Sequence, residues 1–105
     1  MSSALVIDWE SREKDEVIPL GSHGLMRDVW RPLAEGLGLE LVPHFYSFCP
    51  VEPGNLDRLL SELDTFRAEL VRQDEGDEQS IESVDRLADA FRRLKASEGW
   101  SASIG

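Results

Sequence analysis

The 105-residue sequence is poor in the residues that most often carry chemistry or cross-link a fold. It contains one cysteine, Cys49, together with two histidines and one tyrosine. A single cysteine excludes an intrachain disulfide framework and suits a reducing compartment. The length predicts one domain, and the hydrophobic share of 41% is sufficient for a core.

Basic residues are also scarce, since 11 Lys and Arg stand against 21 Asp and Glu, for a formal net charge of −10. Nucleic-acid binding depends on Lys and Arg that neutralise phosphates, so we expect no nucleic-acid partner. Anionic lipid is disfavoured for the same reason. A basic protein is the partner that electrostatics favours.

Long apolar runs are lacking. The N-terminal residues MSSALVIDW hold only four apolar residues in a row before Asp8, which is too short for the apolar segment of a signal peptide. No run approaches the roughly 18 apolar residues that span a bilayer. We therefore expect a soluble cytoplasmic protein with no membrane contact.

Three segments are predicted to be strands. Residues 4–9, ALVIDW, alternate between two faces, and residues 17–20, VIPL, form a short strand that Pro19 confines to an edge. Residues 39–48, LELVPHFYSF, are apolar on both faces and rich in β-branched and aromatic residues, which is typical of a central strand. With a helix between them, the first and last strands predict a right-handed β-α-β unit.

Residues 22–38 are predicted to form a helix, because their apolar residues recur at helical spacing. Ser22 is a suitable N-cap. Pro32 removes a backbone donor, so it either kinks this helix or stands in the first turn of one that begins later. We prefer the kinked helix, since the apolar stripe passes the proline without a change of phase.

Two amphipathic helices are predicted over residues 55–73 and 80–97, with Asn55 as the N-cap of the first. The short polar turn between them predicts an antiparallel helical hairpin. The expected fold is therefore α+β over residues 1–97: a sheet of two or three strands in the order β–(β)–α–β, followed by the hairpin. Residues 98–105 are expected to be a C-terminal tail, either frayed or docked through Trp100.

A homodimer is a second structural hypothesis. A sheet of two or three strands is marginal alone. The predicted strand 39–48 also carries more apolar surface than one layer of helices covers. A second copy would close the sheet edge or cover the free face.

Motifs for metal, phosphate and nucleophile chemistry are weak. His23, His44 and Cys49, with Asp8 or Glu10, lack the close ligand pairs of zinc sites, so no metal is expected. The GSHG stretch lacks a phosphate-loop pattern, and we expect no cofactor.

Catalysis by Cys49 requires contact with His44, yet residues five positions apart face opposite sides of a strand. Lone cysteines are also commonly buried as small apolar residues. The remaining ligand hypothesis is a pocket at the carboxyl end of strand 39–48, where α/β folds place ligands. Its candidate residues are His44, Tyr46, Cys49, His23 and Asp8. A small enzyme or ligand-binding protein is thus the alternative function.

An acidic run is the clearest candidate for partner binding. No base interrupts it, and its members are Asp74, Glu75, Asp77, Glu78, Glu82 and Asp85. Part of this charge is explained by a solvated turn and by the preference for acids at helix N-termini. In size and acidity the chain resembles the small immunity or antitoxin-type proteins of bacteria, with which it shares bulk properties and no motif. The leading hypothesis is a non-catalytic interaction module that neutralises or docks a basic partner.

Overall fold

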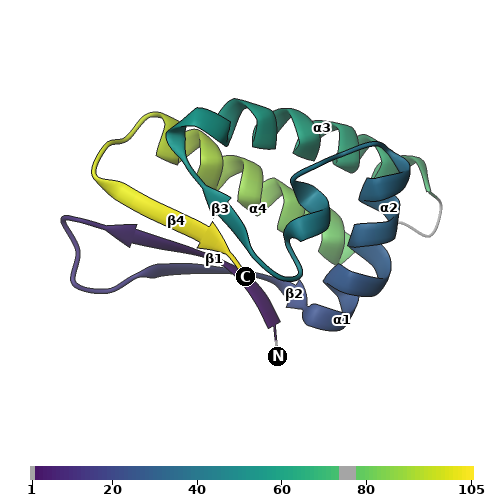
Figure 1. The fold of residues 1–105 in the computed structure, drawn as a ribbon, viewed down its shortest axis with the longest axis horizontal. Coiled ribbons are helices and arrows are strands. Elements are labelled where there is room, and N and C mark those ends of the chain that lie inside the picture. Colours follow the sequence, from purple (N-terminus) through teal and green to yellow (C-terminus); the bar gives the residue numbers. More distant parts are fainter. Residues whose placement is uncertain (1, 74–77) are drawn as a thin grey trace.

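The computed structural model describes residues 2–73 and 78–105 and has an α+β architecture, as the sequence predicts (Figure 1). Two antiparallel strands come first, followed by four short helical segments, a very short strand, a 3-10 turn, two long helices and a last strand. In chain order the elements are β1 (Ser2–Trp9), β2 (Glu16–Ser22), α1 (His23–Leu25), a π-helical turn (Met26–Trp30), α2 (Arg31–Gly36), a 3-10 turn (Val42–His44), β3 (Cys49–Val51), a 3-10 turn (Pro53–Asn55), α3 (Leu56–Arg72), α4 (Glu78–Lys95) and β4 (Trp100–Ile104).

The sheet has four strands in the order β2-β1-β4-β3, and every described pairing is antiparallel. The two strands predicted over 4–9 and 17–20 are confirmed, and β2 lies at an edge as Pro19 requires. The predicted sheet of two or three strands is too small. The structure has β4, which was not predicted, and its third strand in chain order is β3 rather than residues 39–48.

Residues 100–104 are not a tail. They form β4, which lies between β1 and β3 and bonds to both. Its sequence, WSASI, alternates apolar and polar residues, and Ile104 is fully buried. The boundary proposed at residue 97 therefore does not separate a free tail from the domain.

Residues 39–48 do not form a strand, and the predicted β-α-β unit is wrong. They follow Gly38, whose φ of +76° is in the left-handed region, and then turn through the 3-10 segment Val42–His44. Pro43 explains the difference, because a proline cannot donate within a central strand but is accepted in the first turn of a helix. Val42 and Phe45 are buried, so the apolar run still enters the core.

The helical segment after β2 is interrupted where Pro32 predicts an interruption. Ser22 accepts a hydrogen bond from Leu25 N at 3.0 Å, which confirms the N-cap. The chain then widens into the π-helical turn Met26–Trp30, and Pro32 stands in the first turn of α2. This arrangement places Trp30 in the core, where its Nε1 donates to Ser80 Oγ of α4 at 3.1 Å.

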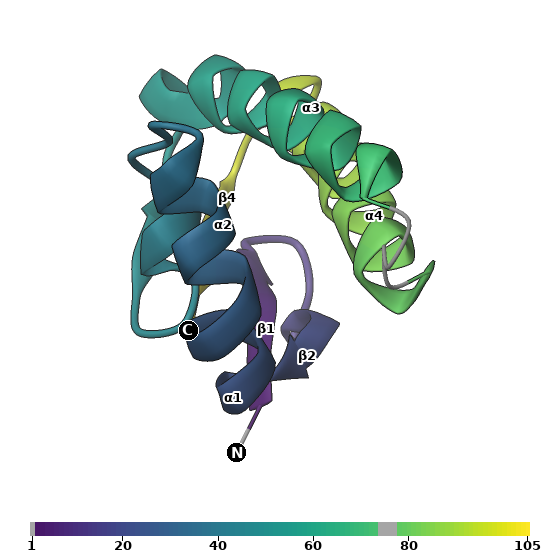
Figure 2. The same ribbon diagram turned by 90° about the vertical axis from the view of Figure 1, so that its right-hand side faces the viewer.

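The two long predicted helices are confirmed as α3 and α4, which lie side by side and run in opposite directions (Figures 1 and 2). Ion pairs join Asp57 to Lys95 and Arg67 to Asp85, as antiparallel helices require. Asn55 is at the start of α3, but its side chain is engaged elsewhere: it accepts from Glu52 N and donates to Pro50 O.

The core lies between the helices and one face of the sheet. Leu5 and Ile7 of β1 point into it, as does Ile104 of β4. The helices supply most of the remaining large side chains, namely Trp30, Leu59, Leu63, Phe66, Leu87, Phe91 and Leu94. Among the described residues, no helix combines the length and apolarity that crossing a membrane requires.

Polar contacts fix α4 to the edge strand β2. Ser83 Oγ donates to Leu20 O at 2.8 Å, and Arg93 Nη2 donates to Glu16 Oε2 at 2.7 Å. The hydrogen bond from Arg93 lowers the pKa of the Glu16 carboxyl, although partial burial acts in the opposite direction.

Candidate interaction surface

Two of the five predicted pocket residues lie together. His44 and Tyr46 line an open surface groove of about 600 Å³, whose other wall includes Arg31 and Glu35 of α2. The Arg31 guanidinium lies 5.0 Å from the Tyr46 ring centroid and is 2.9 Å from Glu35 Oε1. The charge of Arg31 is thus already compensated within the groove.

The other three candidates lie elsewhere. Cys49 pairs with Ile104 and faces the core, whereas Asp8 pairs with Ser101 and is exposed on the opposite face of the sheet. His23 begins α1. Among the residues that the structure describes, no three His, Cys, Asp or Glu side chains are grouped to hold a metal ion.

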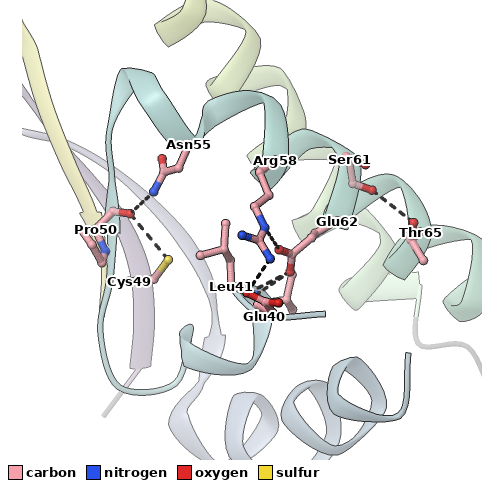
Figure 3. Close-up of polar contacts among 10 residues, drawn as sticks. Glu40, Leu41, Cys49, Pro50, Asn55, Arg58, Ser61, Glu62 and Thr65 are labelled. Atoms are coloured by element: carbon pink, nitrogen blue, oxygen red, sulfur yellow. Dashed lines mark hydrogen bonds and ion pairs between the residues drawn. The ribbon is translucent and has the colours of Figure 1, made fainter. Parts of the chain in front are cut away.

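Cys49 has the environment of a core residue. It is buried in β3, and its Sγ lies 3.7 Å from Pro50 O (Figure 3). Burial, reinforced by the negative charge of Glu62, raises the pKa of the Cys49 thiol to about 11. The thiol therefore remains protonated at neutral pH, and a protonated thiol is a poor nucleophile.

This pKa predicts an alkaline loss of stability. The unfolded thiol ionises near pH 8.5, whereas the folded thiol keeps its proton to about pH 11. Between these values the unfolded chain binds fewer protons, so stability falls as pH rises. Urea midpoints measured from pH 7 to pH 10 should fall more steeply for the wild type than for Cys49→Ala, which serves as the control for other titrating groups. Equal slopes would contradict the prediction, as would rapid reaction of the native protein with a thiol reagent at neutral pH.

A buried carboxylate that the sequence analysis missed positions the segment 39–48. Glu62 of α3 is only 6% exposed, and its Oε1 accepts from Leu41 N at 2.9 Å and from Val42 N at 3.3 Å (Figure 3). Its Oε2 lies 3.4 Å from Arg58 Nε, and Arg58 also contacts Glu40 at 2.6 Å. Glu62 stands three residues after Leu59 and four before Phe66 on the apolar stripe of α3. An acid on that stripe is the signal that could have revealed it.

The predicted acidic patch is only partly described, because Asp74, Glu75 and Asp77 lie outside the described residues. Glu78, Glu82 and Asp85 belong to α4 and are exposed. Two of these three have basic neighbours: Asp85 is 2.7 Å from Arg67, and Glu82 is 3.7 Å from Arg86. The described part of this patch is therefore largely neutralised by the protein itself.

Within the part of the chain that the structure describes, ion pairs engage ten of the eleven basic side chains. Surface pairs of this kind add little stability, but they leave few cations available to a partner. The ten are Arg12, Arg27, Arg31, Arg58, Arg67, Arg72, Arg86, Arg92, Arg93 and Lys95. The acidic excess is thus what the surface presents outward.

Acidic residues gather at one end of the sheet, around the β1–β2 turn and the approach to β4. Five exposed acids belong to this acidic end: Asp8, Glu10, Glu13, Asp15 and Glu98. The segments that carry them lie together, because Glu10 N bonds to Gly99 O at 2.9 Å. Arg12 and Lys14 are the bases of the turn, and Arg12 is directed to Glu16 and to the Trp9 ring.

The face of the sheet opposite the core is here called the open face, and the long helices α3 and α4 lie on the other side of the sheet (Figure 1). Val17 is 58% exposed and Phe48 is 61% exposed. The register and the burial pattern assign to this face Ala4, Val6, Asp8, Val17, Pro19, Phe48, Pro50, Ser101 and Ser103. It is thus apolar or uncharged except at Asp8.

Both edge strands carry a proline, Pro19 in β2 and Pro50 in β3. A proline removes a backbone donor from an edge, which disfavours the addition of another strand. The open face, rather than either edge, is consequently the surface of the sheet best suited to a partner. In comparisons with known proteins, no family model, curated protein or solved structure matches this chain.

Proposed function

We propose that this protein is a non-catalytic interaction module that binds a basic protein. The observation that carries the proposal is that ion pairs within the described residues engage ten of the eleven basic side chains, in a chain whose formal net charge is −10. Such a surface attracts a cationic protein over a distance of about a Debye length and repels other acidic molecules.

The geometry of the former pocket candidates favours binding over catalysis. The only thiol is buried and its pKa is raised to about 11, so it is unsuited to nucleophilic attack at neutral pH. The groove beside His44 and Tyr46 has its cation, Arg31, already paired with Glu35. The alternative of a small enzyme or ligand-binding protein therefore has less support.

The test is affinity capture with the intact chain, followed by purification of each captured protein and measurement of binary binding. We expect a partner with an isoelectric point above about 9. Its Kd should rise by about tenfold between roughly 50 mM and 300 mM NaCl, because screening weakens electrostatic association.

Two results would contradict the proposal. One is a partner that is neutral or acidic, or whose Kd changes by less than about twofold with salt. The other is that no captured protein forms a purified binary complex with a Kd below about 10 µM, which corresponds to a binding free energy near −7 kcal/mol. As a control, this protein and its captured partner are purified in the same way for both salt concentrations, so that loss of protein does not account for a difference in Kd.

A further inference from the structure

We infer that the open face of the sheet is the docking surface and that its occupant is a basic protein with an apolar contact centre bordered by Arg or Lys on one side. This inference rests on the proposed function and adds the location and the chemistry of the contact. It follows from the order of side chains across the four strands.

Two adjacent rows of the open face are apolar or small. In the first, Phe48 adjoins Gly105, Gly105 pairs with Ala4, and Ala4 pairs with Pro19. The Phe48 ring lies 3.9 Å from where a Cβ on Gly105 would stand, which places the ring on this face.

The second row runs Pro50, Ser103, Val6, Val17 in the same direction across the sheet. Together the rows form a low platform: exposed Phe48 and Val17 stand at its rims, and the central strands carry Ala4, Ser103 and Gly105 beside the half-buried Val6. An exposed platform of this kind loses water favourably when a partner covers it.

The next row carries charge. Asp8 pairs with Ser101 on the same face, and the acidic end that contains Glu10, Glu13 and Asp15 follows directly in the β1–β2 turn. The face thus passes from apolar to acidic along the strands. A complementary partner has an apolar patch with its cations on one side only, and this asymmetry would fix the orientation of docking.

A second copy of the chain fits this face less well. Each copy carries −10, so two copies repel, and two-fold packing would set Asp8 either against its own equivalent or against the apolar rows. The two reasons for a dimer were a marginal sheet of two or three strands and the apolar surface of segment 39–48. The sheet has four strands, and Val42 and Phe45 are buried within one chain. A basic partner removes the repulsion and covers the same surface.

The proposal can be tested with defined probes on the intact protein. The peptide acetyl-VKVKVKVK-amide offers an apolar face with cations, and acetyl-SKSKSKSK-amide offers the cations alone. In NMR titrations at low salt we expect the first peptide to bind about fivefold more tightly, with amide shifts concentrated at Val6, Asp8 and Val17.

A matched pair of double variants supplies the control. Val17→Lys with Asp8→Lys alters the open face, whereas Val71→Lys with Asp64→Lys alters α3. Val71 is 56% exposed against 58% for Val17, and both pairs change the net charge equally. We expect the open-face pair to weaken binding of the valine peptide about fivefold more than the α3 pair does. If a variant fails to fold, the positions of the NMR amide shifts in the wild-type protein still show which surface the peptide binds.

Three results would overturn the inference: shifts that map to α3 and α4, equal binding of the two peptides, or equal effects of the two double variants. Sedimentation that reveals a dimer abolished by Val17→Lys would likewise overturn it, with a second copy as occupant. Binding of the captured partner to the open-face variant distinguishes failure of this inference from failure of the proposed function. If a basic partner binds the open-face variant as well as the wild type, only the location fails, and if no basic partner exists, the proposed function fails.

Discussion

Replacing Glu62 with alanine is expected to destabilise the protein by about 3 kcal/mol, because it leaves the buried amides of Leu41 and Val42 without their acceptor. A buried amide that loses its partner costs roughly 1–3 kcal/mol, and the carboxylate serves two of them. The loss also removes one of the two acidic neighbours of Arg58, the other being Glu40. Urea unfolding monitored by circular dichroism measures the effect.

Two further variants sharpen this prediction. Glu62→Gln keeps one carbonyl oxygen for the two amides, so it should lose less than half as much stability as the alanine variant. Asp89→Ala removes an exposed ion pair with Arg92 on the neighbouring helix α4 and should cost about 0.5 kcal/mol or less. Of these variants, Glu62→Ala alone should accelerate hydrogen exchange at the amides of Leu41 and Val42. An unchanged exchange rate at these amides would show that Glu62 does not hold the segment.

Deletion of residues 100–105 is expected to abolish cooperative folding. The deletion removes the ladder on both sides of β4, the buried side chain of Ile104, and the Trp100 indole that donates to Leu94 O at the end of α4. Burial of one large aliphatic side chain alone contributes roughly 1.5–3 kcal/mol, and a domain of this size has only about 5–15 kcal/mol in total. The loss of the central strand therefore exceeds the stability available.

Thermal unfolding and NMR amide dispersion measure this outcome. The full chain should give a sigmoidal transition and dispersed amides, and the shortened chain should give neither. Ile104→Ala tests the same strand more gently and should cost about 2–4 kcal/mol, whereas Ser101→Ala, at an exposed position of β4, should be near neutral. A shortened chain with a wild-type transition would mean that β4 is dispensable.

The helices could be predicted from the sequence because their signal is periodic and long. The stripe Leu59, Leu63, Phe66, Leu70 continues through α3, and no competing strand pattern fits it. The first two strands could also be predicted from the sequence. Alternation in 4–9 indicates a strand with two different faces, and the proline in 17–20 confines the second strand to an edge.

The segment 39–48 could not be placed from periodicity, because a short apolar run fits a buried strand and a buried turn equally well. Pro43 was the local evidence against a strand, and the carboxylate of Glu62, twenty residues away, completes the explanation. That hydrogen bond joins residues twenty positions apart, so a sequence pattern read over ten residues cannot detect it. The alternation Trp100, Ala102, Ile104 was available as a strand signal, but five residues are too few to outweigh the appearance of a polar tail.

The candidate surface was less predictable than the fold. The acids were counted correctly from the sequence, and the i,i+4 spacing of Glu82 and Arg86 could be read there, but the sequence could not show that Asp85 lies beside Arg67 of the other helix. Nor could it show that Asp8 borders an exposed apolar face, because Val6, Val17 and Phe48 come from three separate segments. Such a surface is created by strand register alone.

The position of β4 has a consequence for the order of folding. β1 and β2 are joined by a short turn, so their hairpin can form within microseconds of the chain becoming free to fold. The pairing of Val6 with Ser103 instead closes a loop that contains nearly the whole described chain, at a cost in chain entropy that must be met before its contacts form. During synthesis, β3 would have no neighbouring strand until residues 100–104 have left the ribosome. Completion of the sheet is therefore a late step, and the apolar edge of β1 is exposed to chaperones, or to aggregation, until then.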